Sequence, residues 1–301
     1  MLLTLALSVS AMTVPTIVSG EAITYYVSPK GNDAWTGKLP MPNRDRSDGP
    51  FAGLERARDA SRAMRRKEGG LKQPVRVQLR GGTYFLTRTL ELGPLDSGTA
   101  ACPITYEAYP GERPVLSGGI RLSGARETTA DGRTAWTVEV PARAMQPQPF
   151  RQLFVHGQRR FRSRLPKEGY YRIESLPDQK QGLQWYEGQS RFVFAPGDIR
   201  AWNHLTDVDV VALHFWIESR MRIASVDEGQ RIVTLDRTST FRLSDDFTAD
   251  RGARYYIENV YEALTEPGTW HLASRDRVLT YLPMPGEAPK STEMVAPRLT
   301  T

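Results

Sequence analysis

The sequence predicts an all-β protein with a single α-helix near its N-terminus. From Val75 onward, short runs rich in β-branched and aromatic residues recur, and each is followed within a few residues by Gly, Pro or Asp. No helical pattern separates these runs, which argues against an alternating α/β sheet. The chain also carries 25 glycines and 21 prolines among its 301 residues, as expected for a fold with many turns.

The helix is expected just after residue 50. Its apolar positions recur at helical spacing with charged residues between them: Phe51, Leu54, Ala57, Ala60 and Met64. Asp48 and Pro50 supply a cap and a first turn, and Gly69 and Gly70 end the helix.

Residues 1–22 are interpreted as a signal peptide. The apolar stretch LLTLALSVSA has the size of a signal-peptide core, and small residues follow it up to Ala22. No Lys or Arg precedes Lys30, so the signal is atypical, and a hydrophobic first strand of the mature fold is the alternative. The stretch ends just before the strand-like segment ITYYVSP, which favours export to the bacterial periplasm or the exterior.

Residues 23–118 are predicted to form a capping helix and the first rungs of a parallel β-helix. The segments LRGGTYFL and YPGERPVLSGG each combine a sharp Gly-containing bend with extended stretches on both sides. Stacked rungs of such a solenoid are short strands joined by bends, and each rung buries its apolar face on the next. Only about two rungs fit before Gly119, which is too few for independent stability.

Residues 119–290 are predicted to form an inserted antiparallel β-sandwich. Their strands are longer and alternate more regularly, as in AWTVEVP, RQLFVHG, DVDVVALHFWIESRMRIASVD and RYYIENV. Hairpin turns are expected at Asp227-Glu228-Gly229 and near Ala273. Residues 291–301 are interpreted as a truncated return to the β-helix.

The composition excludes several classes of protein. Cys102 is the one cysteine, so an intramolecular disulfide and a cysteine-rich zinc site are ruled out, and this residue is expected to be buried and apolar in behaviour. The four histidines lack metal-binding spacing, so neither a metal nor a cofactor is expected. No apolar run reaches the 18 residues or more of a membrane span.

The net charge is +6, and the basic residues are most closely spaced between Arg151 and Arg164, where no acidic residue occurs. One interpretation is a patch for an anionic partner such as nucleic acid or an acidic glycan. The segment also alternates about His156-Gly157 as a β-hairpin with polar side chains facing water would. The hairpin explains the charges without a ligand, and no nucleic-acid partner is expected.

An ordered set of segments spans nearly all of residues 24–297. They read YYVSPKGNDAWTG, DGPFAGLERARDA, VQLRGGTYFL, LGPLDSGT, ITYEAYPGERPVLSGG, RQLFVHGQRR, FAPGDI, HFWIESRMRIASVD, NVYEALTEPGTWHL and YLPMPGE. This set resembles secreted right-handed parallel β-helix proteins with a pectate-lyase-like fold. The family includes glycoside hydrolases of the fucosidase, xylanase and xylosidase kind.

The resemblance implies that a β-sandwich interrupts the β-helix, and that the catalytic carboxylates lie on later rungs, beyond residue 301. The chain is then expected to be the N-terminal portion of an exported carbohydrate-active protein whose parent activity is glycoside hydrolysis. It would bind a polysaccharide or oligosaccharide and would be inactive alone. Its unfinished β-helix end, residues 75–118, would favour self-association.

Two alternatives belong to other functional classes. The chain could be a non-catalytic carbohydrate-binding or surface module built on the sandwich. It could also be a fragment of a polysaccharide lyase, which would need a Lys or Arg base and usually calcium, and no acidic cluster in the sequence resembles a calcium site.

Asp207 and Asp209 are the first carboxylate pair to consider as catalytic residues, since glycoside hydrolysis needs two carboxyl groups about 5–10 Å apart. They lie at positions i and i+2 of one strand, while Val208 and Val210 point the other way, into the expected core. Both aspartates are therefore interpreted as the solvent face of a strand, and no catalytic residue is assigned within the chain.

Three aromatic residues are the candidates for contact with a sugar: Trp185, Tyr186 and Trp202. Trp185 is the strongest of them, because a large ring in a polar loop has no obvious structural role there. Trp216, within LHFWIES, is expected in the sandwich core instead.

Overall fold

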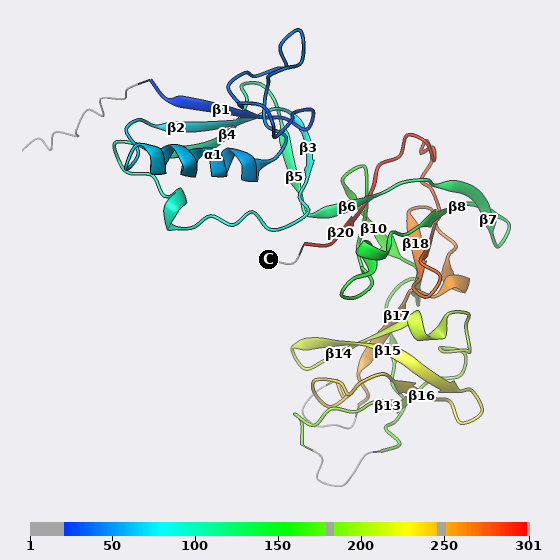
Figure 1. The fold of residues 1–301 in the computed structure, drawn as a ribbon. Coiled ribbons are helices and arrows are strands. Elements are labelled where there is room, and N and C mark those ends of the chain that lie inside the picture. Colours follow the sequence, from blue (N-terminus) through cyan, green and yellow to red (C-terminus); the bar gives the residue numbers. More distant parts are fainter. Residues whose placement is uncertain (1–20, 179–183, 246–250, 300–301) are drawn as a thin grey trace, which may run out of the picture. The chain divides into compact units, whose positions relative to one another are not determined.

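The computed structural model describes residues 21–178, 184–245 and 251–299, so the predicted signal peptide lies almost wholly outside the described residues. The chain divides into two compact units (Figure 1). One comprises the residues up to Gly118 together with Leu299–Thr301, and the other comprises Gly119–Arg298. Each unit has its own sheets and is described separately.

The first unit is built on parallel strands and one helix. Its elements are β1 (Ile23–Val27), α1 (Leu54–Lys67), β2 (Val75–Leu79), β3 (Gly82–Phe85), the 3-10 turn η1 (Pro94–Asp96), β4 (Ile104–Ala108) and β5 (Pro114–Ser117). The strands β1, β2 and β4 form a three-stranded parallel sheet in that order, and β3 pairs with β5 in a separate parallel pair.

The predicted helix is confirmed as α1. Leu54 and Ala57 are buried on its apolar face, and they share a core with Val75 and Val77 of the neighbouring strand β2. Asp48 does not cap the helix as predicted, because its carboxylate binds the backbone N–H and the hydroxyl of Thr36 instead. No helix in the described part of the chain is long and apolar enough to cross a membrane.

The prediction of a right-handed parallel β-helix is wrong for the described residues. The parallel strands form one three-stranded sheet and one separate pair, and the chain passes from β1 to β2 through the helix α1. The apolar face of the sheet is thus covered by a helix, whereas rungs of a β-helix cover one another. The segment LRGGTYFL does bend at Gly82, whose φ is 123°, but a bend alone does not determine what packs on the strands around it.

The second unit begins with an eight-stranded sheet of order β6-β20-β9-β10-β18-β19-β8-β7. Its strands are β6 (Gly119–Leu122), β7 (Arg126–Ala130), β8 (Arg133–Glu139), β9 (Leu153–Val155), β10 (Gln158–Arg162), β18 (Thr269–Ala273), β19 (Val278–Tyr281) and β20 (Met294–Pro297), with the 3-10 turn η2 (Ala142–Met145) after β8. The neighbours are antiparallel except for β10 and β18, which run parallel.

A seven-stranded antiparallel sheet completes this unit, in the order β11-β17-β14-β15-β16-β13, with β12 also on β17. Its strands are β11 (Arg164–Leu165), β12 (Tyr171–Arg172), β13 (Arg191–Val193), β14 (Asp209–His214), β15 (Ile217–Asp227), β16 (Ile232–Leu235) and β17 (Arg254–Glu258). The 3-10 turns η3 (Leu205–Asp207) and η4 (Tyr261–Ala263) flank β14 and β17 in sequence.

The predicted β-sandwich is wrong as well, because the two sheets do not share a core. Val210, Ile223 and Tyr255 belong to an apolar cluster drawn from the seven-stranded sheet, while Trp136 and Trp270 belong to one drawn from the eight-stranded sheet. A sandwich would interleave the inner faces of both sheets in one layer. Each sheet here curls around its own apolar side chains. Strand alternation predicts which side chains are buried, but it does not predict which layer covers them.

A buried charge cluster joins the two curled sheets. Asp209, at the start of β14, is 1% exposed and accepts hydrogen bonds from Arg162 of β10 and from Nε of Arg151, the latter at 3.1 Å. Arg162 Nη1 also lies 3.7 Å from the carboxylate of Glu258, which in turn binds Arg220. Arginine side chains of the segment 151–162 therefore hold one sheet to carboxylates of the other.

A second polar link lies beside the first. Asp207 accepts the backbone N–H of Ser274 at 2.8 Å and the Ser274 hydroxyl. The amide of Asn259 donates to the carbonyl oxygens of Asp207 and Leu272 and accepts the Leu272 N–H. All of these links run between the two sheets or their flanking turns.

Asp207 and Asp209 are thus buried, and their assignment to a solvent face is wrong. The strand β14 is buried on both faces, with five of its six residues in the buried class. Strand alternation distinguishes two faces but does not require either to meet water. An aspartate on such a strand is tolerated because arginines of the adjoining sheet pair with it.

We expect Asp209→Asn to lower the free energy of unfolding by about 3–5 kcal/mol, because it leaves Arg162 and Arg151 without their shared counter-charge. Burial opposes ionisation of Asp209, but the two arginines outweigh it and hold the pKa of this carboxyl below its ordinary value of 3.8. Its stabilising contribution is therefore present above that value and is lost as the pH falls through the folded-state pKa. Urea unfolding at neutral and acidic pH measures both effects.

Asp131→Asn is the matched control, since Asp131 is an exposed aspartate that also pairs with an arginine, Arg133. We expect it to change the unfolding free energy by less than about 0.5 kcal/mol. Equal effects of the two substitutions at neutral pH would contradict the role given to Asp209.

Candidate functional site

Five aromatic side chains gather on one end of the seven-stranded sheet and are called the aromatic cluster below. They are Trp185, Tyr186, Phe215, Trp216 and Phe241. The ring of Trp185 is central, with centroid distances of 5.1 Å to Phe241 and 5.6 Å to both Tyr186 and Trp216. Trp216 and Phe241 are also in contact, at 5.3 Å.

The aromatic cluster is formed at the tip of a hairpin. His214 of β14 pairs with Ile217 of β15, so Phe215 and Trp216 form the two-residue turn between them, and Phe215 has a φ of 52°. Trp216 is therefore 62% exposed, and its assignment to the core is wrong. The signal for this turn is weak, because Phe-Trp is not among the Asn-Gly or Gly-containing pairs that usually occupy such turns.

Large aromatic surfaces of the cluster face solvent. Tyr186 is 58% exposed and Trp185 is 37% exposed, in addition to Trp216. Exposed aromatic rings that contact one another form a broad apolar surface, and such surfaces on soluble proteins commonly bind ligands or partners.

Backbone bonds hold the loop that carries Trp185 and Tyr186. The carbonyl oxygen of Trp185 accepts the N–H of Arg242 at 3.0 Å. Gly188 lies so close to Ser239 that a Cβ at this glycine would be 1.7 Å from the Ser239 carbonyl oxygen. Only glycine permits this approach. The close contact places the loop against the segment that supplies Phe241.

A buried histidine supports the hairpin tip beneath the rings. His214 is 2% exposed, and its Nε2 lies 2.8 Å from the hydroxyl of Ser219. The same hydroxyl accepts the N–H of Thr240, next to Phe241. Burial lowers the pKa of His214, so the ring is neutral near pH 7 and is a structural support for the turn.

Two of the three predicted sugar-contact residues come together in the aromatic cluster. Trp185 and Tyr186 are neighbours with rings nearly perpendicular at 84°. Trp202 is partly buried and packs against the apolar core of the same sheet, away from the described ring contacts of the cluster. Sequence reasoning did not assign Phe215, Trp216 or Phe241 to this site.

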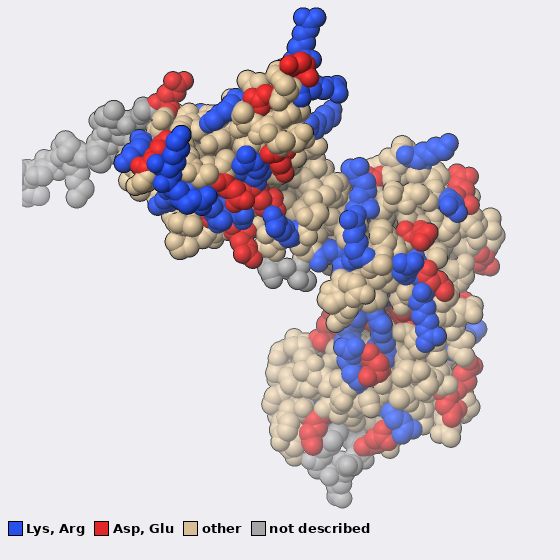
Figure 2. All heavy atoms as spheres, viewed as in Figure 1, with Lys and Arg blue, Asp and Glu red and all other residues tan. Residues whose placement is uncertain are grey.

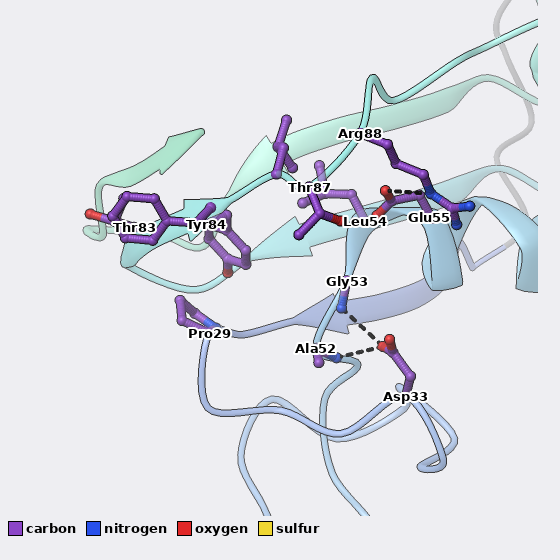
Figure 3. Close-up of a pocket in the computed structure, with 12 residues that line it drawn as sticks. Pro29, Asp33, Ala52, Gly53, Leu54, Glu55, Thr83, Tyr84, Thr87 and Arg88 are labelled. Atoms are coloured by element: carbon purple, nitrogen blue, oxygen red, sulfur yellow. Dashed lines mark hydrogen bonds and ion pairs between the residues drawn. The ribbon is translucent and has the colours of Figure 1, made fainter. Parts of the chain in front are cut away.

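The first unit contains a pocket of about 610 Å³ at the start of α1 (Figure 3). Asp33 Oδ1 accepts the backbone N–H groups of Ala52 and Gly53 at 2.8 and 2.9 Å. Glu55, which follows Leu54 in the sequence, forms an ion pair with Arg88, with 3.5 Å between its Oε1 and the arginine Nε (Figure 3). Asp33 thus anchors Ala52 and Gly53, the two residues that lead into α1 at Leu54, where the sequence had predicted a cap from Asp48.

Asp33 and Glu55 are near each other in this pocket. One oxygen of each lies 3.4 Å from the position that a Cβ on Gly53 would take, so the two oxygens are at most about 6.8 Å apart. Both carboxylates have structural partners, Asp33 the start of the helix and Glu55 the Arg88 guanidinium. The fold therefore accounts for this pair of carboxylates.

The described residues contain no group of three or more His, Cys, Asp or Glu side chains arranged to hold a metal ion. Cys102 is buried, as its sequence context indicated.

Comparisons with known proteins give one match. No family model matches the chain, and neither does any curated protein. A solved structure titled "Glycoside hydrolase" is similar to it, with 25% sequence identity and a TM-score of 0.71. The match covers 92% of this chain and 46% of that structure, so this chain spans less than half the length of that protein.

We expect Asp33→Ala to loosen the start of α1, because the N–H groups of Ala52 and Gly53 lose their acceptor. The loss is about 1 kcal/mol, which corresponds to roughly fivefold faster exchange of the Ala52 and Gly53 amides, just before the first turn. Hydrogen exchange followed by mass spectrometry measures it. Asp45→Ala is the control, since Asp45 lies in the same loop and binds only Ser47. Unchanged exchange in Asp33→Ala would show that the Asp33 contact is dispensable.

Proposed function

We propose that this chain is the N-terminal, carbohydrate-binding portion of an exported glycoside hydrolase. The similarity of fold to a glycoside hydrolase over 92% of the chain supports the class of protein. The aromatic cluster supports a role in contacting the glycan. The observation that carries the proposal is the exposure of three contacting rings, Trp185, Tyr186 and Trp216, on a hairpin turn and a neighbouring loop.

The chemistry of sugars matches such a surface. A pyranose ring presents C–H groups on its faces and hydroxyl groups on its edges, so it can pack one face on an aromatic ring while its hydroxyls stay hydrated. Tyr and Trp combine a large apolar area with a polar atom that can reach a hydroxyl. Preformed rings also lose little conformational freedom when they bind.

We expect Trp216→Ala to weaken binding of neutral oligosaccharides by about tenfold or more, since it removes the most exposed ring of the cluster and Trp residues often carry much of the binding energy of a surface. Isothermal titration with xylohexaose and with a fucosylated xyloglucan oligosaccharide measures the effect. Tyr186→Ala should act in the same direction, because it removes the second most exposed ring of the cluster.

Tyr170→Ala is the matched control. Tyr170 is 49% exposed and packs on Tyr256, outside the aromatic cluster. Its loss should leave the affinity for these neutral sugars unchanged. Similar losses in the Tyr170 and Trp216 variants, or no binding by the unaltered protein, would contradict the proposal.

We propose further that the catalytic carboxylates of the parent enzyme lie outside this chain. Several of the carboxylates described above already have structural partners: Asp209 is bound by arginines, Asp207 is bound by Ser274, and Asp33 is bound by the backbone N–H groups just before α1. A carboxylate that serves as general acid or nucleophile must instead be able to reach a substrate.

We therefore expect the chain alone to release no nitrophenol from aryl fucosides or aryl xylosides during prolonged incubation. Turnover above the buffer rate that disappears in Glu55→Gln would contradict this, and it would identify the pocket at the start of α1 as an active site. Arg88→Gln serves as the control there, because it breaks the same ion pair without removing a carboxylate.

If the chain binds glycans and a longer form of the protein does not hydrolyse them, the alternative of a non-catalytic binding module would replace the proposed enzyme. Export rests on the apolar N-terminal stretch, and sequencing the N-terminus of the secreted protein tests it. Self-association through residues 75–118 stays a prediction.

A further inference from the structure

A pocket of about 420 Å³ in the unit Gly119–Arg298 has five basic residues among the twelve of its lining and is called the arginine pocket below. Its basic residues are Arg159, Arg160, Arg162, Arg164 and Lys167. Glu258 and Glu266 are the two acidic residues of the lining. In Figure 2, Lys and Arg side chains gather where the two sheets of this unit meet, with acidic side chains among them.

Three of these cations already have carboxylate partners. Arg160 pairs with Glu287 at 2.9 Å, and Arg162 is buried against Asp209. Lys167 lies 3.8 Å from Glu266 and donates to a backbone carbonyl. Glu258 is itself neutralised by Arg220.

Arg159 and Arg164 differ from the others. Among residues 21–178, 184–245 and 251–299, no carboxylate lies within ion-pair distance of either guanidinium. Arg164 donates to the carbonyl oxygens of Pro166, Lys167 and Gly169, which fixes its position but leaves its charge uncompensated. Arg159 is exposed, with its guanidinium 5.8 Å from the ring centre of Phe161. The arginine pocket thus has an excess of positive charge.

Phe161 supplies an apolar wall for the same pocket. It is 67% exposed, the most exposed of the large hydrophobic residues described, although it lies within the strand β10. Gly268 and Met284 line the same pocket, and they pack so closely that a Cβ on Gly268 would lie 2.9 Å from the Met284 sulfur. The C–H face of a sugar ring can pack on the exposed Phe161 ring, with a charged substituent near the Arg159 guanidinium.

We propose that the arginine pocket binds an anionic sugar residue, with its carboxylate or sulfate on Arg159, the positive charge of Arg164 in the same lining, and its ring on Phe161. The inference rests on the proposed carbohydrate function and adds the class of glycan, one that carries acidic residues. Arginine suits both anions, because its planar fork donates two parallel hydrogen bonds to carboxylate or sulfate oxygens. The basic run from Arg151 to Arg164 therefore combines structural ion pairs with a ligand site.

The buried position of Arg162 corrects the interpretation of this run as a hairpin whose polar side chains face water. The hairpin of β9 and β10 about His156-Gly157 is confirmed. Its polar side chains do not all face water, since Arg162 is buried and Arg160 is bound to both Tyr281 and Glu287. Arg159 is the member that remains at the surface without a counter-charge.

Matched ligands that differ only in charge test the proposal. Titration calorimetry would compare tetragalacturonate with its methyl ester, and a sulfated carrageenan tetrasaccharide with its desulfated form. We expect the unaltered protein to bind at least one anionic form about tenfold more tightly than its neutral counterpart, and to lose this preference as salt is raised. The two arms show whether carboxylate or sulfate is preferred.

Variants assign the preference to the pocket. Arg159→Gln should weaken binding of the anionic form about five- to tenfold and leave the neutral form unchanged. Phe161→Ala should weaken both forms by similar factors. Both residues are exposed, so neither substitution disturbs a core. Arg143→Gln, the same charge change at an exposed arginine outside the pocket, is the control and should have no effect.

The outcomes separate this inference from the proposed function. Equal affinity for charged and neutral forms, or equal effects of Arg159→Gln and Arg143→Gln, overturns the anionic site. If neutral oligosaccharides still bind in a manner sensitive to Trp216→Ala, the proposed function stands without it. If no oligosaccharide binds, both proposals fail.

Discussion

The ion pairs of Asp209 with Arg162 and Arg151 are the interaction on which the second unit depends. Each of its sheets curls around its own apolar cluster, so the two sheets have no common hydrophobic layer to hold them together. A carboxylate that is 1% exposed, bound by two arginines that lie outside its own sheet, supplies the charged part of this connection, beside the second polar link through Asp207 and Asn259. Buried ion pairs are costly to desolvate, but removing one partner costs more, so the pairing strongly favours one arrangement of the sheets.

The strand that carries Asp209 also links the two proposed ligand sites. The strand β14 begins at Asp209, in the charge cluster, and ends at His214, which supports the aromatic cluster. Its six residues span about 17 Å at the rise of an antiparallel strand. The arginine pocket lies on the Asp209 side, because Arg162 and Glu258 line it. The two sites therefore lie toward opposite ends of one buried strand, and a rigid strand fixes the distance between them.

Local features of the fold could be predicted from the sequence, whereas the packing of its layers could not. The helix α1 and the β9–β10 hairpin follow from periodicity over a few residues and from one His-Gly turn. Asp33, which binds the two N–H groups just before α1, lies too far away in the sequence to be part of a local motif. The burial of Asp209 depends on arginines 47 and 58 positions away, so strand alternation could not distinguish it from a solvent-facing residue.

The aromatic cluster was partly predictable, because only some of its members have a local signal in the sequence. Trp185 and Tyr186 stand in a polar loop, which is a local signal that their rings lack a core to fill. Trp216 lies between two well-alternating strands, and only the structure shows that the chain turns at this residue. Phe241 joins the cluster because Gly188 lets two loops meet, a tertiary contact without a sequence motif of its own.

Several of the arginines have a structural explanation. A fold with many turns leaves carbonyl oxygens without strand or helix partners, and the five N–H donors of arginine can satisfy several of them at once. Arg164 binds three such carbonyls, and Arg65 binds two, those of Leu95 and Ser97. A count of charges therefore overstates the surface available to an anionic partner. The informative residue is one with neither a carbonyl nor a carboxylate, and in the arginine pocket that residue is Arg159.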